Sequence, residues 1–550
     1  MYREIRGLHE AAYILALFAL GSQLLALVRD KLLAYQFGAS DLSDIYWAAF
    51  RVPDLLFAIF ASVLSVYVLI PFVAERMLES TSKARDLLSA VFTWFLFGYG
   101  AAAALIALFA HTIIAMLFPG FDAAEQTTMV LLMRVLLLQA FFLSLSNLFG
   151  VVTQLHRKFV LYAISPLLYN LGIILGIVVL YPLWGLSGIA LGAMLGAVLH
   201  LGIQIPFVIH SGLAPRVVWR VDVRMLATIA KSSLPRALAL TLQQCVLLAI
   251  TSIATLMASG SVTVLQYAYN LQAVPLTIIG VSYSVAAFPT LARLYSEGDR
   301  ITFLQHVYAA LRHIIFWSIP ITALFVVIRA QLVRVIYGAG AFDWSDTRLT
   351  AAVLSLFVIS LVAQSVHLLI VRAYYAAGNT RTPLVTTALS SAGIVCVALL
   401  LHVFYAQTPA FAFVLASVFR VENVPGTEVL VLPLAFSGIF LVHSVILVYL
   451  FMRHYGREAL GDLVRVLLQS CGAGIAISAT AYICLNILVD GFRTDTVMGV
   501  FLQGFIAGTI ALFAGALFLF GVDNRESKEI WRSFHRRFWK VSPIVPQEKE

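Results

Sequence analysis

The chain of 550 residues is 61% hydrophobic and only 11% charged, whereas an average soluble protein is about half apolar and about a quarter charged. This composition excludes a protein that folds mainly in water. The net charge of +9 does not indicate a nucleic-acid partner, because the basic residues lie mostly in short segments between apolar runs and in the C-terminal tail.

Apolar runs long enough to cross a bilayer follow one another along the chain. A helix needs about 20 apolar residues to span the hydrocarbon, and continuous apolar runs favour helices over the alternating strands of a barrel. Dividing the longest runs at their Pro, Gly and Ser clusters predicts an all-α polytopic membrane protein of about 14 transmembrane helices. The predicted spans lie at approximately 11–28, 45–74, 87–117, 129–153, 159–180, 186–209, 234–257, 262–291, 303–328, 349–374, 382–406, 429–451, 466–489 and 497–521.

The first span, 11–28, runs directly into Arg29-Asp30-Lys31. A cleaved signal peptide would instead end at a small-residue cleavage site, so this segment is predicted to be a retained helix. Alternate loops between the later spans are rich in Arg and Lys, and the positive-inside bias then predicts that both termini are cytoplasmic. The four cysteines fall within apolar runs without metal-ligand spacing, which predicts neither disulfides nor a metal site.

The two halves of the chain resemble each other. Phe121-Asp122 before the fourth span corresponds to Phe342-Asp343 before the tenth, and a proline lies near the end of both the second and the eighth span. Each half therefore contains about six spans in the same orientation, which predicts two lobes around a central cavity and alternating access by rocking. We assign the N-terminal lobe to 1–225, the C-terminal lobe to 226–455, two further helices to 456–522 and a basic cytoplasmic tail to 523–550.

Ionisable residues inside the predicted spans are candidates for function, since a charge at the bilayer centre costs about 2.5–3.5 kcal/mol on insertion scales. Arg51 is the strongest candidate, because it lies about two turns into the second span, where a guanidinium facing the cavity would bind phosphate bidentately. The alternative is a structural pair with Asp44 or Asp54. Asp44 lies two helical turns before Arg51 on roughly the same face, and a gate or an ion pair is predicted for it.

Other polar residues of the predicted spans have two readings each. Arg29 and Asp30 end the first span on the predicted outer side, as either a charged gate that closes the cavity or an ordinary interfacial pair. Arg236 follows a proline at the start of the seventh span and either reaches the cavity or snorkels to the cytoplasmic surface. Gln23 and Asn270 lie on spans of the predicted cavity walls, where helix–helix hydrogen bonds are the alternative role.

The sequence contains no sign of catalysis on the predicted loops, where no nucleophile elbow, phosphate-binding loop or paired-carboxylate motif occurs. His111, His313, His367 and His443 are scattered singly without ligand spacing, so structural or interfacial roles are expected for them. The sequence therefore predicts a transporter without a cofactor rather than an enzyme or an ATP-driven pump. We expect its energy to come from an ion gradient or from the membrane potential, which is worth about 2.3 kcal/mol per charge per 100 mV.

Several stretches resemble a known family. They are Leu27–Ala34, Phe37–Ser40, Ala49–Leu56, Ile336–Asp343, Asp346–Thr350 and Arg372–Pro383. On these residues the chain is similar to the MurJ/MviN family of lipid II flippases, in the MOP exporter superfamily, over nearly its whole length. The residues that match the family motif are Arg29, Asp30, Asp44 and the basic Arg51. Where the family usually carries charge, this chain has Gln23, Phe57, Ser62, Asn270 and Ala273.

The resemblance implies a flippase that moves the undecaprenyl-pyrophosphate-linked peptidoglycan precursor from the inner to the outer leaflet of the cytoplasmic membrane. It also implies a cationic central cavity, a lipid-tail groove at 456–522 and a role in cell-wall assembly and cell shape beside membrane lipids and other cell-wall synthesis proteins. A flippase for another polyprenyl-linked glycan, a membrane glycosyl transferase and a non-transporting scaffold are the alternatives. The residues expected to contact the substrate are Arg51, Arg236, Asn270 and Gln23, and those expected to form the gate are Arg29, Asp30 and Asp44.

Overall fold

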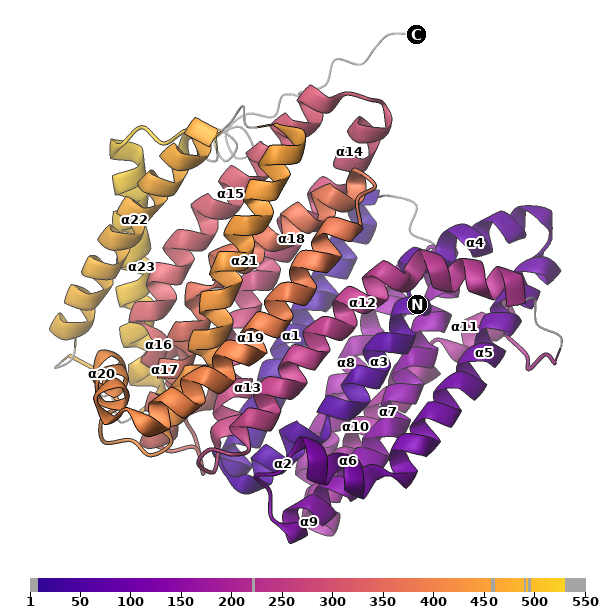
Figure 1. Ribbon diagram of the computed structural model, residues 1–550, viewed down its shortest axis with the longest axis horizontal. Helices are drawn as coiled ribbons and strands as arrows, with labels where there is room; N and C mark the ends of the chain where they lie inside the picture. Colours follow the sequence, from indigo (N-terminus) through magenta and orange to yellow (C-terminus); the bar gives the residue numbers. More distant parts are fainter. Residues whose placement is uncertain (1–7, 220–222, 457–459, 489–490, 493–495, 530–550) are drawn as a thin grey trace. The chain divides into compact units, whose positions relative to one another are not determined.

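The computed structural model describes residues 8–219, 223–456, 460–488, 491–492 and 496–529 (Figure 1). Within these ranges the ordered elements are helices, and no strand occurs. The predicted all-α fold is therefore confirmed.

The chain packs as two compact units. Unit 1 comprises Met1–Tyr267, Ile336–Thr350 and Leu384–Ala435, and unit 2 comprises Ala268–Val335, Ala351–Pro383 and Phe436–Glu550. Residues 226–267 thus pack with the N-terminal helices, and the units do not follow the boundary at 225 that the sequence repeat suggested. The two lobes assigned from the repeat stay a prediction about the two halves of the sequence.

Unit 1 contains most of the N-terminal half of the chain. Its helices are α1 (Leu8–Phe37), α2 (Asp41–Ala49), α3 (Arg51–Val63), α4 (Val66–Glu79), α5 (Thr81–Leu108), α6 (Ala110–Leu117), α7 (Ala123–Leu155), α8 (Phe159–Leu175), α9 (Tyr181–Trp184), α10 (Leu186–Gly202), α11 (Ile205–His210), α12 (Val223–Ala254) and α20 (Pro409–Phe419). Unit 2 contains α14 (Ser282–Ser296), α15 (Arg300–Val327), α18 (Leu361–Ala376), α22 (Leu460–Ile487) and α23 (Val497–Gly521). Residues of both units occur in α13 (Ser261–Leu276), α16 (Arg329–Tyr337), α17 (Trp344–Ile359), α19 (Arg381–Gln407) and α21 (Val431–Tyr455).

Among the described residues, 12 helical segments are long and apolar enough to cross a membrane. Counted as one span, the pair α17 and α18, which is bent by 40°, brings the number to 13. Every predicted span from the second to the fourteenth has a counterpart among them, and the first lies within α1. The predicted count of about 14 is therefore close to the observed one.

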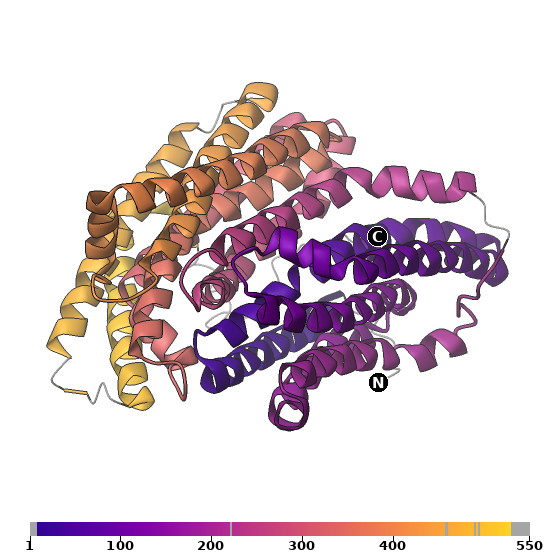
Figure 2. The same ribbon diagram turned by 60° about the horizontal axis from the view of Figure 1, so that its bottom comes forward.

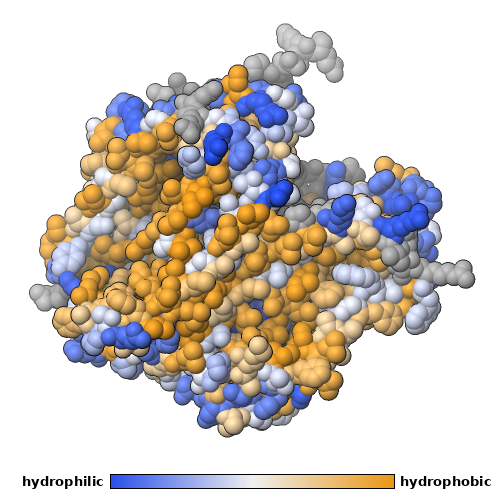
Figure 3. Space-filling model, viewed as in Figure 1, coloured by the Kyte–Doolittle hydropathy of each residue, from blue (hydrophilic) through white to orange (hydrophobic). Residues whose placement is uncertain are grey.

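The surface of these helices suits a lipid environment. Figure 3 shows hydrophobic side chains along the lengths of the helices and hydrophilic ones gathered at their ends. Large apolar side chains such as Leu468, Ile475 and Phe513 are more than half exposed. Because water would penalise such exposure, the chain is a multi-pass membrane protein.

A seam of glycines packs α8 against α10 in unit 1. Gly192 and Gly196, one turn apart on α10, face Gly172 on α8. A Cβ atom at Gly172 would lie 2.2 Å from the Cα of Gly196, so the two backbones touch where a side chain would keep them apart. Small residues at this spacing are the usual means by which membrane helices approach closely.

The two C-terminal helices pack side by side in unit 2 (Figures 1 and 2). One buried apolar cluster is formed by Leu324 of α15, Ile328 directly after α15, Ile477 and Ala481 of α22, and Ala511 of α23. These helices are the ones that the resemblance associates with a lipid-tail groove.

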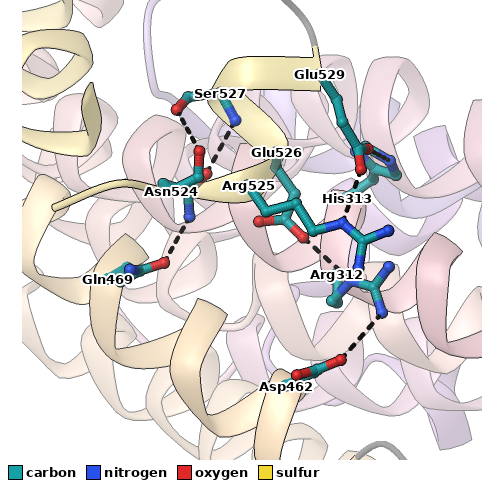
Figure 4. A network of polar contacts seen from close by, with 9 residues as sticks. All are labelled: Arg312, His313, Asp462, Gln469, Asn524, Arg525, Glu526, Ser527 and Glu529. Atoms are coloured by element: carbon teal, nitrogen blue, oxygen red, sulfur yellow. Dashed lines mark hydrogen bonds and ion pairs between the residues drawn. The ribbon is translucent and has the colours of Figure 1, made fainter.

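Polar contacts clamp the segment after α23 onto α15 and α22 (Figure 4). Arg312 Nε lies 3.1 Å from Glu526 Oε1, and the side chains of these two residues are 13% and 2% exposed. Arg312 Nη1 also lies 3.9 Å from Asp462 Oδ2, and His313 Nε2 lies 3.7 Å from Glu529 Oε2. Because the carboxylate of Glu526 is buried, this pair fixes where the chain continues beyond the last span.

Candidate functional site

A break in the second membrane-spanning segment positions Arg51. Helix α2 ends at Ala49 and α3 begins at Arg51, with Pro53 in the first turn of α3. Proline has no N–H, so the carbonyl of Ala49 loses the helical hydrogen bond that residue 53 would donate. Arg51 thus lies about 15 Å from the start of the membrane-spanning segment Asp41–Glu79.

The guanidinium of Arg51 is held by two polar side chains of unit 1. Its Nε donates a hydrogen bond of 2.8 Å to Thr251 Oγ1 on α12, and its Nη2 donates one of 2.6 Å to Gln266 Oε1 on α13. Thr251 is only 3% exposed. Two neutral acceptors from separate helices thus orient the guanidinium.

Arg29 on α1 is the second cation of the site. Its Nε and Nη2 lie 2.8 and 2.7 Å from Asp30 Oδ1, and its Nη1 donates a hydrogen bond of 3.1 Å to Asn170 Oδ1 on α8. Asn170 Nδ2 in turn donates to Ser22 Oγ at 3.3 Å, which fixes the orientation of the amide. The Arg29–Asp30 pair is therefore integrated into the packing of α1 against α8, and it is largely buried, with side chains 16% and 3% exposed.

A polar pocket of about 170 Å³ lies within unit 1 between these two arginines. Besides Arg29 and Arg51, its lining residues are Tyr46, Trp47, Phe50, Asp54, Tyr169, Ile173 and Gln266. Aromatic rings form part of the wall, and the charged lining groups are two cations and one carboxylate. A pocket at membrane depth with this excess of guanidinium groups is suited to bind an anion such as a phosphate ester.

Asp44 has a different function from the ion pair with Arg51 that was considered from the sequence. Its Oδ1 accepts hydrogen bonds from Thr263 N at 2.8 Å and Thr263 Oγ1 at 2.6 Å, and its Oδ2 accepts one from Gly260 N at 2.9 Å. These donors lie at the N-terminus of α13, where backbone N–H groups have no partner within the helix. Asp44, 3% exposed, therefore caps α13 from α2 and holds the two helices together.

The remaining predicted contact residues lie elsewhere. The side chain of Gln23 is exposed on α1 and is not part of the pocket wall. Asn270 is half-buried on the part of α13 that belongs to unit 2. The side chain of Arg236, on α12, lies outside the described part of the chain.

Sequence reasoning missed four polar residues of the site. They are Asn170, Tyr169, Thr251 and Gln266. Each is a polar residue inside an apolar span. Gln266 lies one helical turn before Asn270, which is among the residues predicted from the sequence to contact the substrate. The polarity was visible in the sequence, but the partner of each residue was not.

The arrangement has the parts of a binding site. Among the described residues, no group of three or more His, Cys, Asp or Glu side chains is arranged to hold a metal ion. The two arginines of the pocket are oriented by hydrogen bonds to residues of separate membrane helices. A helical bundle that crosses the membrane many times and holds oriented cations within its spans defines a polytopic membrane transporter.

The chain belongs to the lipid II flippase MurJ family, whose model matches residues 33–502. The family assignment made from the sequence stretches is thus confirmed. Members of this family are transporters rather than enzymes, and the activity that the family defines is the transport of lipid II across the membrane. The substrate is accordingly a lipid-linked precursor.

Curated relatives and solved structures agree with this family. The chain is 26% identical over 386 residues to a probable lipid II flippase MurJ of Rickettsia prowazekii, covering 70% of this chain and 76% of the relative. It is 24% identical over 504 residues to one of Bdellovibrio bacteriovorus, covering 88% and 91%.

Two solved structures share the fold. One is a lipid II flippase MurJ in an inward closed conformation, with a TM-score of 0.72, 21% identity and coverage of 93% of this chain and 100% of that one. The other is an inward-facing multidrug resistance MATE family transporter of the MOP superfamily, with a TM-score of 0.63, 14% identity and coverage of 81% and 96%. The predicted MOP-type helical architecture is therefore confirmed.

Proposed function

We propose that this chain moves lipid II from the inner to the outer leaflet of the cytoplasmic membrane by alternating access, and that Arg51 binds the diphosphate of the substrate. The observation that carries the proposal is the pocket of unit 1, which has Arg51 and Arg29 in its wall at membrane depth. A diphosphate needs oriented donors when it leaves water, because an unpaired anion in hydrocarbon is strongly disfavoured.

The contacts of Arg51 suit this role. Arg51 donates to the neutral oxygens of Thr251 and Gln266, and the carboxylate of Asp54 lies in the same pocket wall. Hydrogen bonds to neutral acceptors are weaker than bonds to an anion, so an arriving phosphate would compete well for the guanidinium. Asp54 in the same wall would repel the anion and helps to release it.

The size of the pocket limits which part of the substrate it takes. Its volume of about 170 Å³ is far above the roughly 10–15 Å³ that one water needs. It is below the roughly 300–1,000 Å³ of sites that enclose drug-sized ligands. The pocket is therefore suited to a diphosphate and not to the glycan and peptide attached to it.

We further propose that Arg29, Asp30 and Asp44 form the outer gate. Asp44 ties α2 to the N-terminus of α13, and the Arg29–Asp30 pair ties α1 to α8 through Asn170. Both links depend on charge-assisted hydrogen bonds, which are strong while formed and can be exchanged for water or for substrate. Opening the gate would then consist of releasing one of these links.

The orientation and partners of the chain complete the proposal. The Arg- and Lys-rich alternate loops support cytoplasmic positions for both termini. Fusion of a reporter that is active only outside the cytoplasm to the C-terminus should give no signal, and a signal would reverse the topology. Other cell-wall synthesis proteins are proposed as partners, and no cofactor is invoked.

Complementation tests the proposed function. A bacterium is depleted of its own lipid II flippase, and the wild-type chain, Arg51→Ala or Arg134→Ala is expressed at matched membrane levels. Arg134 is the control because it is an arginine of the α7 span that is exposed and bonds the carbonyl of Ala107. We expect the wild type and Arg134→Ala to restore growth and Arg51→Ala to fail. Failure of the wild type despite stable expression would overturn lipid II as substrate.

A second candidate is a flippase for another polyprenyl-linked glycan. The pocket volume is compatible with this second candidate, because a site that holds only the diphosphate does not distinguish between the glycans attached to that diphosphate. Lipid-linked glycans of different composition, added in turn to purified protein that contains labelled lipid II, would separate the two functions. Equal displacement by a foreign glycan carrier supports the second candidate, and displacement by lipid II alone supports the first.

A further inference from the structure

Two histidines of unit 2 lie against each other deep in the membrane. His443 is the middle residue of the 25-residue helix α21, about 18 Å from either end of that helix. His367 lies on α18, and the centroids of the two imidazole rings are 4.8 Å apart. One of these titratable side chains thus lies at the midpoint of α21, and the other lies in the middle part of α18 (Leu361–Ala376).

The pair has little contact with other polar groups. His443 is 4% exposed. Both of its ring nitrogens, together with Nδ1 of His367, are buried without a hydrogen-bond partner among the described residues. The nearest ring is that of Phe440, 5.3 Å from His367 and 5.8 Å from His443. Because buried polar atoms are nearly always paired, three such nitrogens in one place point to a ligand that the resting packing does not supply.

A run of polar side chains leads along the same helices toward the pair. Gln364, one turn before His367, donates to Ser360 Oγ at 2.9 Å and to Gln272 Oε1 at 3.2 Å. Ser437 on α21 donates to Ser360 Oγ at 3.1 Å. Ser360 stands at the 40° bend between α17 and α18. The polar run therefore lies between the bend and the helical turn that precedes His367.

The chemistry of the pair favours a proton over other cations. Alkali and alkaline-earth ions prefer oxygen ligands, and zinc sites use at least three protein ligands. Among the described residues, no three His, Cys, Asp or Glu side chains come together to hold a metal ion. An imidazole nitrogen offers one lone pair to a proton, and a second proton on the facing ring is disfavoured by repulsion, so two rings in contact bind a single proton as a coupled unit.

The other titratable groups on the surrounding helices are engaged elsewhere. Tyr283 of α14 and His313 of α15 stack on each other with centroids 5.9 Å apart, and His313 also faces Glu529. Arg372 of α18 and Tyr449 of α21 lie more than one turn beyond the pair and have interactions of their own. Within the described part of the chain, no carboxylate forms an ion pair with His367 or His443. Among the titratable groups of these helices, the histidine pair is thus the one whose charge would change when a proton binds here.

We propose that His367 and His443 form a proton-binding site that couples this transporter to a proton gradient. The coupling rests on the proposed function, whereas the binding of the proton does not. One imidazole nitrogen accepts a proton from the aqueous phase on one side of the membrane, the facing ring shares the resulting charge, and the same N–H bond breaks when the proton leaves to the other side. No oxidant, reductant or other reactant takes part.

Proton binding is tested on the full chain in lipid nanodiscs by NMR of ¹³C-labelled histidine. The two resonances that are missing from His367→Gln and His443→Gln respectively identify the pair. We expect both resonances to move together as the pH is lowered in the wild type, and removal of one histidine to shift the titration of the other. The proposal is overturned if neither resonance moves over the pH range in which the protein stays folded, or if each titrates independently of the other.

Coupling is tested in proteoliposomes that contain lipid II, with the membrane potential held at zero by valinomycin and equal K⁺. We expect a gradient of one pH unit to change the flipping rate of the wild type about 3- to 10-fold, and His443→Gln and His367→Gln to lose this response. The control is His454→Gln, an exposed histidine of the same helix that bonds the carbonyl of Leu450. A pH response kept in both variants, or missing from the wild type, would overturn the coupling. No flipping by the wild type at any pH would refute the proposed function, and the NMR titration would still decide the proton site.

Discussion

Replacing Asp44 should loosen the start of α13. Its carboxylate accepts bonds from the backbone N–H groups of Gly260 and Thr263 and from the Thr263 hydroxyl. In Asp44→Ala the hydroxyl can rotate to another acceptor, but the two backbone donors stay buried and unpaired, at about 1–3 kcal/mol each. Because such terms are not fully additive, we expect a local loss of about 2–4 kcal/mol.

Hydrogen exchange measures this loss where it occurs. A local loss of about 2–4 kcal/mol corresponds to amide exchange that is roughly 30- to 700-fold faster. We expect the acceleration in peptides that cover the first turn of α13. Asp41→Ala is the matched control, because Asp41 is an exposed carboxylate in the first turn of the same helix α2. Unchanged exchange in Asp44→Ala, or equal acceleration in Asp41→Ala, would refute the capping role.

Three further changes test other contacts. Gln266→Leu removes the acceptor that lies 2.6 Å from Arg51 Nη2. The variant should bind lipid II about 2- to 10-fold more weakly, because the guanidinium is then misoriented. Unchanged affinity would show that Gln266 does not position Arg51. Gly192→Ala would bring a Cβ within 2.4 Å of the Cα of Gly176 and should cost about 1–3 kcal/mol of stability. The control is Gly202→Ala on the same helix, where the space around the glycine is open. In thermal unfolding, the control should lose far less stability than Gly192→Ala. Arg312→Leu leaves the carboxylate of Glu526, 2% exposed, without its cation and should lower the free energy of unfolding by about 3–5 kcal/mol. The double variant Arg312→Leu/Glu526→Leu should recover much of that loss.

The sequence predicted the membrane spans well, because the bilayer imposes a length and an apolar composition that can be read locally. It also predicted the adjacent Arg29–Asp30 pair, whose partners are neighbours in the chain. The contacts of Arg51 could not be read in the same way, since Thr251 and Gln266 lie 200 and 215 residues away. Local patterns do not specify which distant helix supplies an acceptor.

Asp44 illustrates the same limit at a helix end. Its position two turns before Arg51, on roughly the same face, predicted a gate or an ion pair. The carboxylate reaches the N–H groups at the start of α13, which have no partner within that helix. A cap supplied by a separate helix leaves no signature in the sequence of the helix that it caps.

The affinity of the purified chain for lipid II, compared between the wild type, Arg51→Lys and Arg51→Ala, tests the central claim most directly. Loss of a charge-assisted contact worth about 1.5–3 kcal/mol should weaken binding about 10- to 150-fold in Arg51→Ala, with Arg51→Lys in between because lysine keeps the charge without the bidentate geometry. Arg134→Ala should bind as tightly as the wild type. Equal affinities for the wild type and Arg51→Ala would contradict the account, since the diphosphate would then be held without the pocket that Arg51 lines.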